Sequence, residues 1–200
     1  MEGVEFLSAA IQNCGRTLDA ICLNAGVGVS GEFTSTDLTR ELSMIGLNID
    51  SAVHLTKRIL PIMISAGHGK ILYTSSIAAT MPGPYYAVYA ATKAFLQSFS
   101  EAIRFEMKDK GITVTSLQPG ATETNFFARA DMLDTPAGPA KKDDPAQVAE
   151  QGFEALMAGR DHVVAGSLMN NFMAATAKLA PESTGARMQA MQTKPNSLKT

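Results

Sequence analysis

The chain has 200 residues, 46% of them hydrophobic and 18% charged, which suits one folded domain with a buried core and excludes a disordered chain. With 17 basic and 19 acidic side chains the net charge is -2 and no basic block is present, so nucleic acid is not expected as a partner. No apolar run reaches the ~18 residues of a membrane span and no export signal opens the chain, so we expect a cytoplasmic protein without membrane contact. The two cysteines and three scattered histidines have no ligand spacing, and no metal site is expected.

Apolar spacing predicts an alternation of helices and strands. Helices are expected at 4–14, 36–66, 86–110 and 145–158, and strands at 18–23, 70–74, 112–117 and 162–165. This alternation is typical of an α/β fold with a Rossmann-like parallel sheet, wrapped by helices through right-handed crossovers. We expect the domain to occupy residues 1–180, followed by a mobile tail at 181–200 with one loose helical turn.

Single residues predict where the long helix at 36–66 begins, loosens and ends. Ser35 or Thr36 can cap its first turn, and Gly69 is expected to close it. Gly46 weakens the turn that leads to Asn48, because glycine is costly inside a helix.

Tyr89 and Lys93 are one helical turn apart, and Ser76 lies 13 positions before the tyrosine. Residues at i and i+4 share a helix face, so the Lys93 ammonium is predicted to lower the pKa of Tyr89 from its usual value of about 10. A tyrosine acidified in this way can transfer protons near neutral pH, and Ser76 can donate a hydrogen bond to the substrate oxygen. The alternative is that Tyr89 and Lys93 form an ordinary exposed pair on an alanine-rich helix.

Motifs in a fixed order along the chain resemble those of the short-chain dehydrogenase/reductase family, from about residue 15 to about residue 165. The resemblance implies an oxidoreductase that interconverts an alcohol and a carbonyl by hydride transfer, with NADP or NAD as cofactor and a small-molecule substrate. The motifs are the Tyr89-Ala90-Ala91-Thr92-Lys93 segment, the strand and turn from Lys70 to Ser76, the Asn24-Ala25-Gly26 turn, Asn48, the Pro119-Gly120 turn and Thr124.

The resemblance also implies the site residues. Lys93 would hydrogen-bond the nicotinamide ribose as well as act on Tyr89, and Asn48 would hold a water that links Lys93 to solvent. Ser75 is the rival of Ser76, and the family's spacing to Tyr89 favours Ser76. The implied catalytic residues are Asn48, Ser76, Tyr89 and Lys93, and the implied cofactor-binding residues are Asn24, Ala25, Gly26, Tyr89, Lys93, Pro119, Gly120, Thr122 and Thr124.

The segment after the Pro119-Gly120 turn resembles the family's substrate lid. Its apolar side chains favour a hydrophobic alcohol or ketone, although simple packing is an equal alternative for Phe126 and Phe127. Pairing of the long helices between subunits, common in the family, implies a homodimer or homotetramer. The apolar lid residues are Ala121, Phe126, Phe127, Met132 and Leu133.

The family's fold opens with a strand and a glycine-rich turn that carries the cofactor's pyrophosphate, whereas this chain opens with a predicted helix. We therefore expect its N-terminal βαβαβ part, with the glycine-rich cofactor motif, to be missing. The stretch from Gly26 to Gly31 matches G-x-G-x-x-G by letter, but the next helix starts late and Asp50 falls in its middle. We do not interpret that stretch as the fingerprint.

Without the first strands, the strand at 18–23 becomes a sheet edge. An apolar, uncharged edge is a template for pairing with another chain, so poor solubility, self-association or partial unfolding is expected unless something covers the edge. The alternative to an active enzyme is a truncated, catalytically silent fragment that acts only through association.

Overall fold

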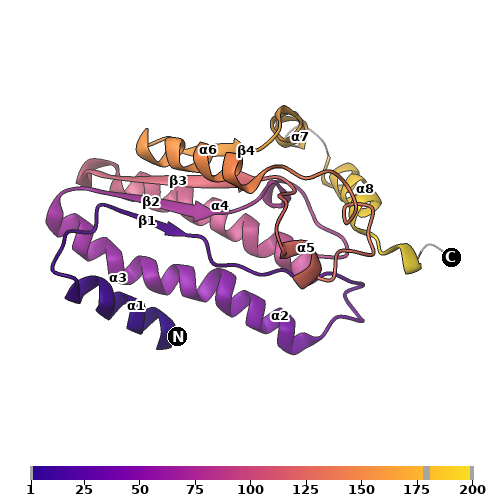
Figure 1. Ribbon diagram of the computed structural model, residues 1–200, viewed down its shortest axis with the longest axis horizontal. Helices are drawn as coiled ribbons and strands as arrows, with labels where there is room; N and C mark the ends of the chain where they lie inside the picture. The colour runs from indigo at the N-terminus through magenta and orange to yellow at the C-terminus, as the bar shows by residue number, and fades with distance from the viewer. Residues whose placement is uncertain (1, 178–180, 199–200) are drawn as a thin grey trace.

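The computed structural model describes residues 2–177 and 181–198. It confirms an α/β fold in which a parallel sheet is flanked by helices (Figure 1). Short 3-10 turns lie at Ile77–Thr80, Lys108–Lys110 and Asn196–Leu198. The helices and strands are α1 (Glu2–Asn13), β1 (Ala20–Leu23), α2 (Leu38–Ile45), a π-helical turn (Gly46–Asp50), α3 (Ser51–Ala66), β2 (Gly69–Thr74), α4 (Ala87–Met107), β3 (Ile112–Pro119), α5 (Phe126–Arg129), α6 (Pro145–Met157), β4 (His162–Ala165), α7 (Leu168–Ala177) and α8 (Glu182–Thr193).

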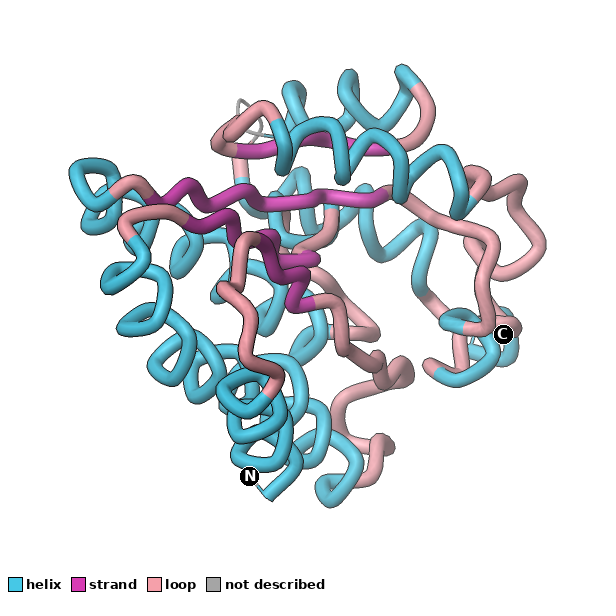
Figure 2. The backbone as a smooth tube through the Cα atoms, turned by 60° about the vertical axis from the view of Figure 1, so that its left-hand side comes forward, coloured by secondary structure: helices cyan, strands magenta, loops and turns pink. Residues whose placement is uncertain are grey.

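The four strands pair in chain order, β1-β2-β3-β4, and every pair is parallel. Because each crossover helix returns the chain to the same end of the sheet, all carboxyl ends of the strands lie along one edge. Figure 2 shows the loops that follow the strands running from that edge towards the C-terminal helices. Ligands bind at this edge in open α/β sheets.

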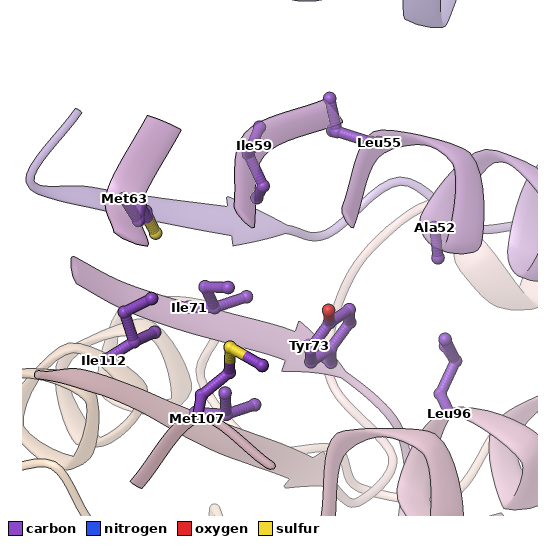
Figure 3. Close-up of a cluster of buried hydrophobic side chains, with 10 residues drawn as sticks. Ala52, Leu55, Ile59, Met63, Ile71, Tyr73, Leu96, Met107 and Ile112 are labelled. Atoms are coloured by element: carbon purple, nitrogen blue, oxygen red, sulfur yellow. The ribbon is translucent and has the colours of Figure 1, made fainter. Parts of the chain in front are cut away.

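Helices cover both faces of the sheet, with α6 on one side and α1, α2 and α3 on the other (Figure 1). Alternate side chains of β2 face the two layers, because successive strand residues point to opposite faces. Ile71 and Tyr73 lie between side chains of α3 and α4 (Figure 3), whereas Leu72 joins a cluster with α6. The Tyr73 hydroxyl is hydrogen-bonded to Thr56 at 2.6 Å, so its polar group is satisfied within the core.

The long helix predicted at 36–66 is interrupted by the π-helical turn at Gly46–Asp50, which confirms the predicted loosening near Asn48. Its predicted caps were wrong. The Asp37 side chain accepts a hydrogen bond from the Arg40 amide and caps α2, so neither Ser35 nor Thr36 does. Gly67, with φ 74°, ends α3 in the left-handed conformation that glycine adopts without strain.

The C-terminal part differs most from its prediction. The structure has a helix of 12 residues, α8, where one loose turn was expected. Contacts with distant segments explain its position: Thr193 donates to the Pro84 carbonyl at 2.8 Å, and the Gln192 carbonyl accepts from the Ala137 amide at 3.1 Å. The boundary at residue 180 and the mobility of the tail stay predictions, and residues 178–180, 199 and 200 lie outside the described residues.

Strand β1 lies at the edge of the sheet. It pairs with β2, and in the part of the chain that the structure describes its other side has no strand partner. Ile21 and Leu23 pack against the core, whereas Ala20 and Cys22 are exposed. The structure thus has the apolar edge that the sequence predicts.

Candidate active site

A cavity of about 860 Å³ opens at the carboxyl ends of the strands. It brings together most of the residues that the sequence singles out, including Ser76, Tyr89 and Lys93. Of the predicted cofactor-binding residues, all except Ala25 line it, as do Tyr86 before α4 and several side chains of α7 and α8 that the sequence analysis missed. The catalytic and cofactor candidates that line it are Asn24, Gly26, Ser76, Tyr89, Lys93, Pro119, Gly120, Thr122 and Thr124, and the missed residues of α7 and α8 are Asn170, Met173, Gln189, Gln192 and Thr193.

Tyr89 lies in the first turns of α4 with its ring against Phe126, at 5.2 Å between centroids. Burial raises the pKa of Tyr89 to about 12, and a hydrogen bond from Ser76 acts in the opposite direction. The phenol therefore stays protonated throughout the neutral range. Because Tyr89 and Lys93 are 9% and 4% exposed, the alternative of an ordinary exposed pair is wrong.

Lys93 does not acidify Tyr89 as predicted. Its Nζ donates to the Thr74 carbonyl at 2.7 Å and lies 5.7 Å from the centre of the Tyr89 ring. Burial lowers the pKa of Lys93 itself to about 8, because a low-dielectric surrounding disfavours the charged amine. The effect of burial outweighs that of the helical spacing on which the prediction was based. It raises the pKa of Tyr89 and lowers the pKa of Lys93, and so favours the neutral form of each side chain.

The two candidate serines differ in what their hydroxyls contact. Ser75 is fully buried and donates to the backbone carbonyl of Lys93 at 2.8 Å, so its proton is used within the fold. The Ser76 oxygen accepts from the Ala78 amide at 3.1 Å and lies 3.5 Å from the Pro119 carbonyl. Of the two serines, only Ser76 acts on the Tyr89 phenol, whose pKa it lowers against the effect of burial, and this favours Ser76 over Ser75.

Asn48 is buried in the π-helical turn and holds the loop after β1 against α4. Its amide exchanges two hydrogen bonds of 3.0 Å with the backbone of Val27, and its Nδ2 also donates to Thr92 at 3.0 Å. A Cβ on Gly26 would lie 3.3 Å from both Asn48 Oδ1 and Lys93 Nζ, so a glycine lets the chain pass close to both groups.

The residues expected to bind the cofactor lie around Ser76, Tyr89 and Lys93. Asn24 accepts a hydrogen bond of 2.9 Å from Thr74, which ties the end of β1 to the end of β2. Thr122 donates to the Gly120 carbonyl at 3.0 Å, and the Thr124 hydroxyl accepts from the Phe126 amide at 3.2 Å. Both threonines thus stabilise the turn that follows Pro119.

The glycine-rich stretch after β1 does not open a helix. Helix α2 begins only at Leu38, well after Gly31, and a Cβ on Gly28 would lie 2.7 Å from the Phe126 ring. This stretch packs against α5 and so lacks the helix N-terminus that a cofactor fingerprint opens into.

The predicted lid residues combine packing and lining. Phe126 contacts Tyr89, and Phe127 packs against Ala130 and Met132, while both phenylalanines also line the cavity. Leu133 is 62% exposed and does not line it. The stretch predicted as a loop contains the short helix α5, which presents Phe126 to the site.

Glu101, Asp161 and His162 carry possible ligand atoms within 4.8 Å of one another, outside the cavity, so the expectation of no metal stays a prediction. Within residues 2–177 and 181–198, no helix has the length and apolarity needed to cross a bilayer.

The parallel sheet, with Ser76, Tyr89 and Lys93 lining a cavity at the carboxyl ends of its strands, defines a Rossmann-like domain; Asn48, the fourth predicted catalytic residue, does not line that cavity. The sequence matches the profile described as short chain dehydrogenase over residues 2–133. The chain therefore belongs to the short-chain dehydrogenase family.

Among its relatives is "Dehydrogenase/reductase SDR family member 7B" of Rattus norvegicus, 34% identical over 127 residues, which are 64% of this chain and 39% of that protein. A short-chain dehydrogenase from Streptomyces avermitilis has a TM-score of 0.75 at 22% identity, covering 88% of this chain and 70% of that one. A short-chain dehydrogenase from Sphingobium yanoikuyae in complex with NADPH has a TM-score of 0.73 at 21% identity, covering 80% and 62%. The chain thus spans about two fifths of the length of the rat relative.

Proposed function

We propose that this chain is a nicotinamide-dependent oxidoreductase that interconverts an alcohol and a carbonyl compound, with Tyr89 as the proton donor and acceptor. The observation that carries this proposal is the convergence of Tyr89, Ser76 and Lys93, from α4 and the end of β2, on one cavity. The NADPH complex of the Sphingobium relative supports a nicotinamide cofactor, and NADP and NAD both remain candidates.

The residues present fit the nicotinamide end of such a cofactor. The cavity is of the size that small-molecule sites have, and Gly26 and Gly120 form part of its wall. Asn24, Lys93 and Thr122 supply polar atoms in its lining. When bound, the cofactor would supply or accept the hydride. The side chains of the protein would bind the substrate oxygen and exchange a proton with it.

Tyr89 is suited to give a proton to that oxygen. Its pKa, raised to about 12 by burial, keeps the phenol neutral at physiological pH, so it is ready as a donor in the direction of carbonyl reduction. Ser76, which lines the same cavity, can donate to that oxygen and hold it in place. In the oxidative direction Tyr89 would first have to lose its own proton, and its phenolate would then remove the hydroxyl proton.

Lys93 and Asn48 would restore the proton that Tyr89 gives away. Burial brings the pKa of Lys93 to about 8, where an amine can both release and regain a proton near neutral pH. Asn48 fixes the π-helical turn beside it, and we propose that a water held there links Lys93 to solvent. Nζ of Lys93 is also the group that would hydrogen-bond the nicotinamide ribose.

The apolar lining around Phe126, Phe127 and Met132 supports a hydrophobic alcohol or ketone as the substrate. The remaining sequence-based expectations, a cytoplasmic location and a homodimer or homotetramer, are part of the same proposal.

The test is reduction of a panel of apolar ketones and aldehydes by the purified chain, followed by the loss of reduced-cofactor absorbance. Turnover that Tyr89→Phe abolishes, in a variant that still folds, is the expected result. A wild-type chain that binds cofactor but reduces none of the panel, and oxidises none of the matching alcohols, would contradict it.

A catalytically silent fragment that acts by association is the second candidate. The observation in its favour is the unpaired apolar edge of β1, in a chain that spans 39% of the rat relative. Cofactor binding separates the two candidates, because a silent fragment has no need to bind either dinucleotide.

A further inference from the structure

Asn170, on α7, is a buried polar residue that lines the cavity and that the sequence analysis did not single out. Its amide lies against the backbone at Gly120, where a Cβ would come within 2.3 Å of Nδ2 and 2.5 Å of Oδ1. Gly120 therefore leaves the space that Asn170 fills. The neighbouring Pro119 carbonyl lies 3.5 Å from the Ser76 hydroxyl, so Asn170 borders the same wall as the catalytic serine.

The hydrogen-bond partners of Asn170 fix the orientation of its side-chain amide. Its Nδ2 donates to a carboxylate oxygen of Asp143 at 2.7 Å and to the Ala165 carbonyl at 2.9 Å. Neither partner can donate, so the nitrogen must point to them and the oxygen away. Among the described residues no donor reaches Asn170 Oδ1, which leaves one hydrogen-bond acceptor of fixed direction at the cavity wall.

Asp143, which orients the Asn170 amide, is itself fixed by several hydrogen bonds. Its side chain also accepts from the Ser167 amide at 3.1 Å, and its backbone pairs with Ala121 at 2.8 Å and Glu123 at 2.9 Å. These bonds join the turn after β4 to the segment that follows the Pro119-Gly120 turn. The acceptor is therefore positioned relative to the proposed nicotinamide wall, and its position does not depend on a flexible side chain.

Thr122 is another polar side chain beside this wall, and its proton is already donated to the Gly120 carbonyl. An acceptor without a matching donor suits a ligand group that has N–H to give. In a nicotinamide, the primary carboxamide carries two such N–H groups.

From this geometry we propose that Asn170 binds the cofactor by accepting a hydrogen bond from the carboxamide NH2 of the nicotinamide, and that Asp143 is the positioning residue that aims it. The inference rests on the proposed function, because it needs a nicotinamide in this cavity. It adds a recognition contact from a part of the chain beyond the last strand of the sheet.

The experiment compares binding of the natural cofactor with binding of its acetylpyridine analogue, in which a methyl group replaces the NH2, by calorimetric titration. The wild-type chain should prefer the natural cofactor by about three- to tenfold, the equivalent of one hydrogen bond. Asn170→Ala should bind both ligands with nearly equal affinity.

Asp143→Asn is the second variant, because an asparagine there can donate to Asn170 Oδ1 and let the amide turn over. This variant should lose the preference for the natural cofactor over the analogue although it retains Asn170. Circular dichroism and the thermal midpoint report whether each variant is folded. If Asn170→Ala does not fold, the wild type and Asp143→Asn still decide.

The outcomes are distinct. Equal affinity of the wild type for both ligands, or an unchanged preference in folded Asn170→Ala, would overturn the role of Asn170 and leave the proposed function standing. Binding of neither ligand by the wild type would overturn both.

Discussion

The amide of Asn48 donates a 3.0 Å hydrogen bond to the Thr92 hydroxyl, across 44 positions of sequence. Thr92 in turn donates to the Tyr89 carbonyl at 2.8 Å. The π-helical turn is thereby connected to the one turn of α4 that separates Tyr89 from Lys93. Asn48 is thus a structural support of the catalytic helix as well as a proposed part of the proton path.

Asn48→Ala should lower the free energy of unfolding by about 2–4 kcal/mol, since it leaves buried partners at Val27 and Thr92 without their hydrogen bonds. Urea unfolding measures the change. Asn24→Ala is the matched control, because Asn24 is exposed and accepts one hydrogen bond from Thr74, and it should cost less than about 1 kcal/mol. Equal losses in the two variants would contradict the role given to Asn48.

Tyr89→Phe should lower kcat by about 10²–10⁴-fold with little change in cofactor affinity, because it removes the proton that the reaction needs and keeps the ring. Steady-state kinetics and calorimetry measure the two effects. Tyr73→Phe removes another buried phenol, which bonds Thr56 in the core. It should cost stability and leave kcat within about twofold, and a comparable fall in kcat there would speak against a specific role of Tyr89.

The stability of the ligand-free chain should rise with pH between about 8 and 10. Burial lowers the pKa of Lys93 to about 8 in the folded chain from 10.5, so in this window the unfolded chain holds a proton that the folded chain has released. Above pH 10 the sign reverses, because burial raises the pKa of Tyr89 and Tyr73 to about 12 and only the unfolded chain loses their protons.

Lys93→Met should abolish the rise, which is on the order of 3 kcal/mol at most, and keep the fall. Urea unfolding at a series of pH values measures both the rise and the fall in the free energy of unfolding. A rise of the same size in the variant would show that another group causes it.

The sequence predicts most elements of this fold because their signals are local. Gly15 and Gly111 have φ of 66° and 72° and follow α1 and the end of the α4 region, where a helix stop was expected. Strand β4 spans His162–Ala165 as predicted. Helix α8 was missed because contacts with remote segments, such as that between Thr193 and Pro84, hold it in place.

The candidate site, too, could be predicted from the sequence only in part. The residues that gather in the cavity could be named from motif spacing, but the pKa of Tyr89 could not be predicted, because burial comes from packing against residues such as Phe126. Asn170 carries no sequence signal at all. Its role is visible only once Gly120 and Asp143 are placed beside it.

Ser76→Ala and Ser75→Ala should differ in their effect on kcat. Ser76→Ala should lower kcat by about 10²–10³-fold, since it removes a donor to the substrate oxygen, and should cost about 1 kcal/mol of stability, since the Ala78 amide loses its acceptor. Ser75→Ala should lower the free energy of unfolding by about 1–2 kcal/mol through the loss of its hydrogen bond to the Lys93 carbonyl. Kinetics and urea unfolding on both variants check this, and the reverse pattern would assign the catalytic role to Ser75.

The edge of β1 should drive self-association at micromolar concentrations, because its unpaired backbone groups and apolar surface can pair with another chain. Cys22→Lys places a charge on this edge and should shift the chain towards monomer in sedimentation velocity. Gln147→Lys adds the same charge on the exposed surface of α6 and should leave association unchanged. A wild-type chain that is monomeric and unfolds cooperatively would contradict the prediction.

Titration of the wild-type chain with NADPH and with NADH, followed by cofactor fluorescence and by thermal shift, tests the assignment of this cavity most directly. We predict saturable binding of at least one dinucleotide, with a rise in thermal midpoint that Lys93→Met reduces. Absence of binding by both, in a chain shown to be folded, would contradict an oxidoreductase and favour the silent fragment.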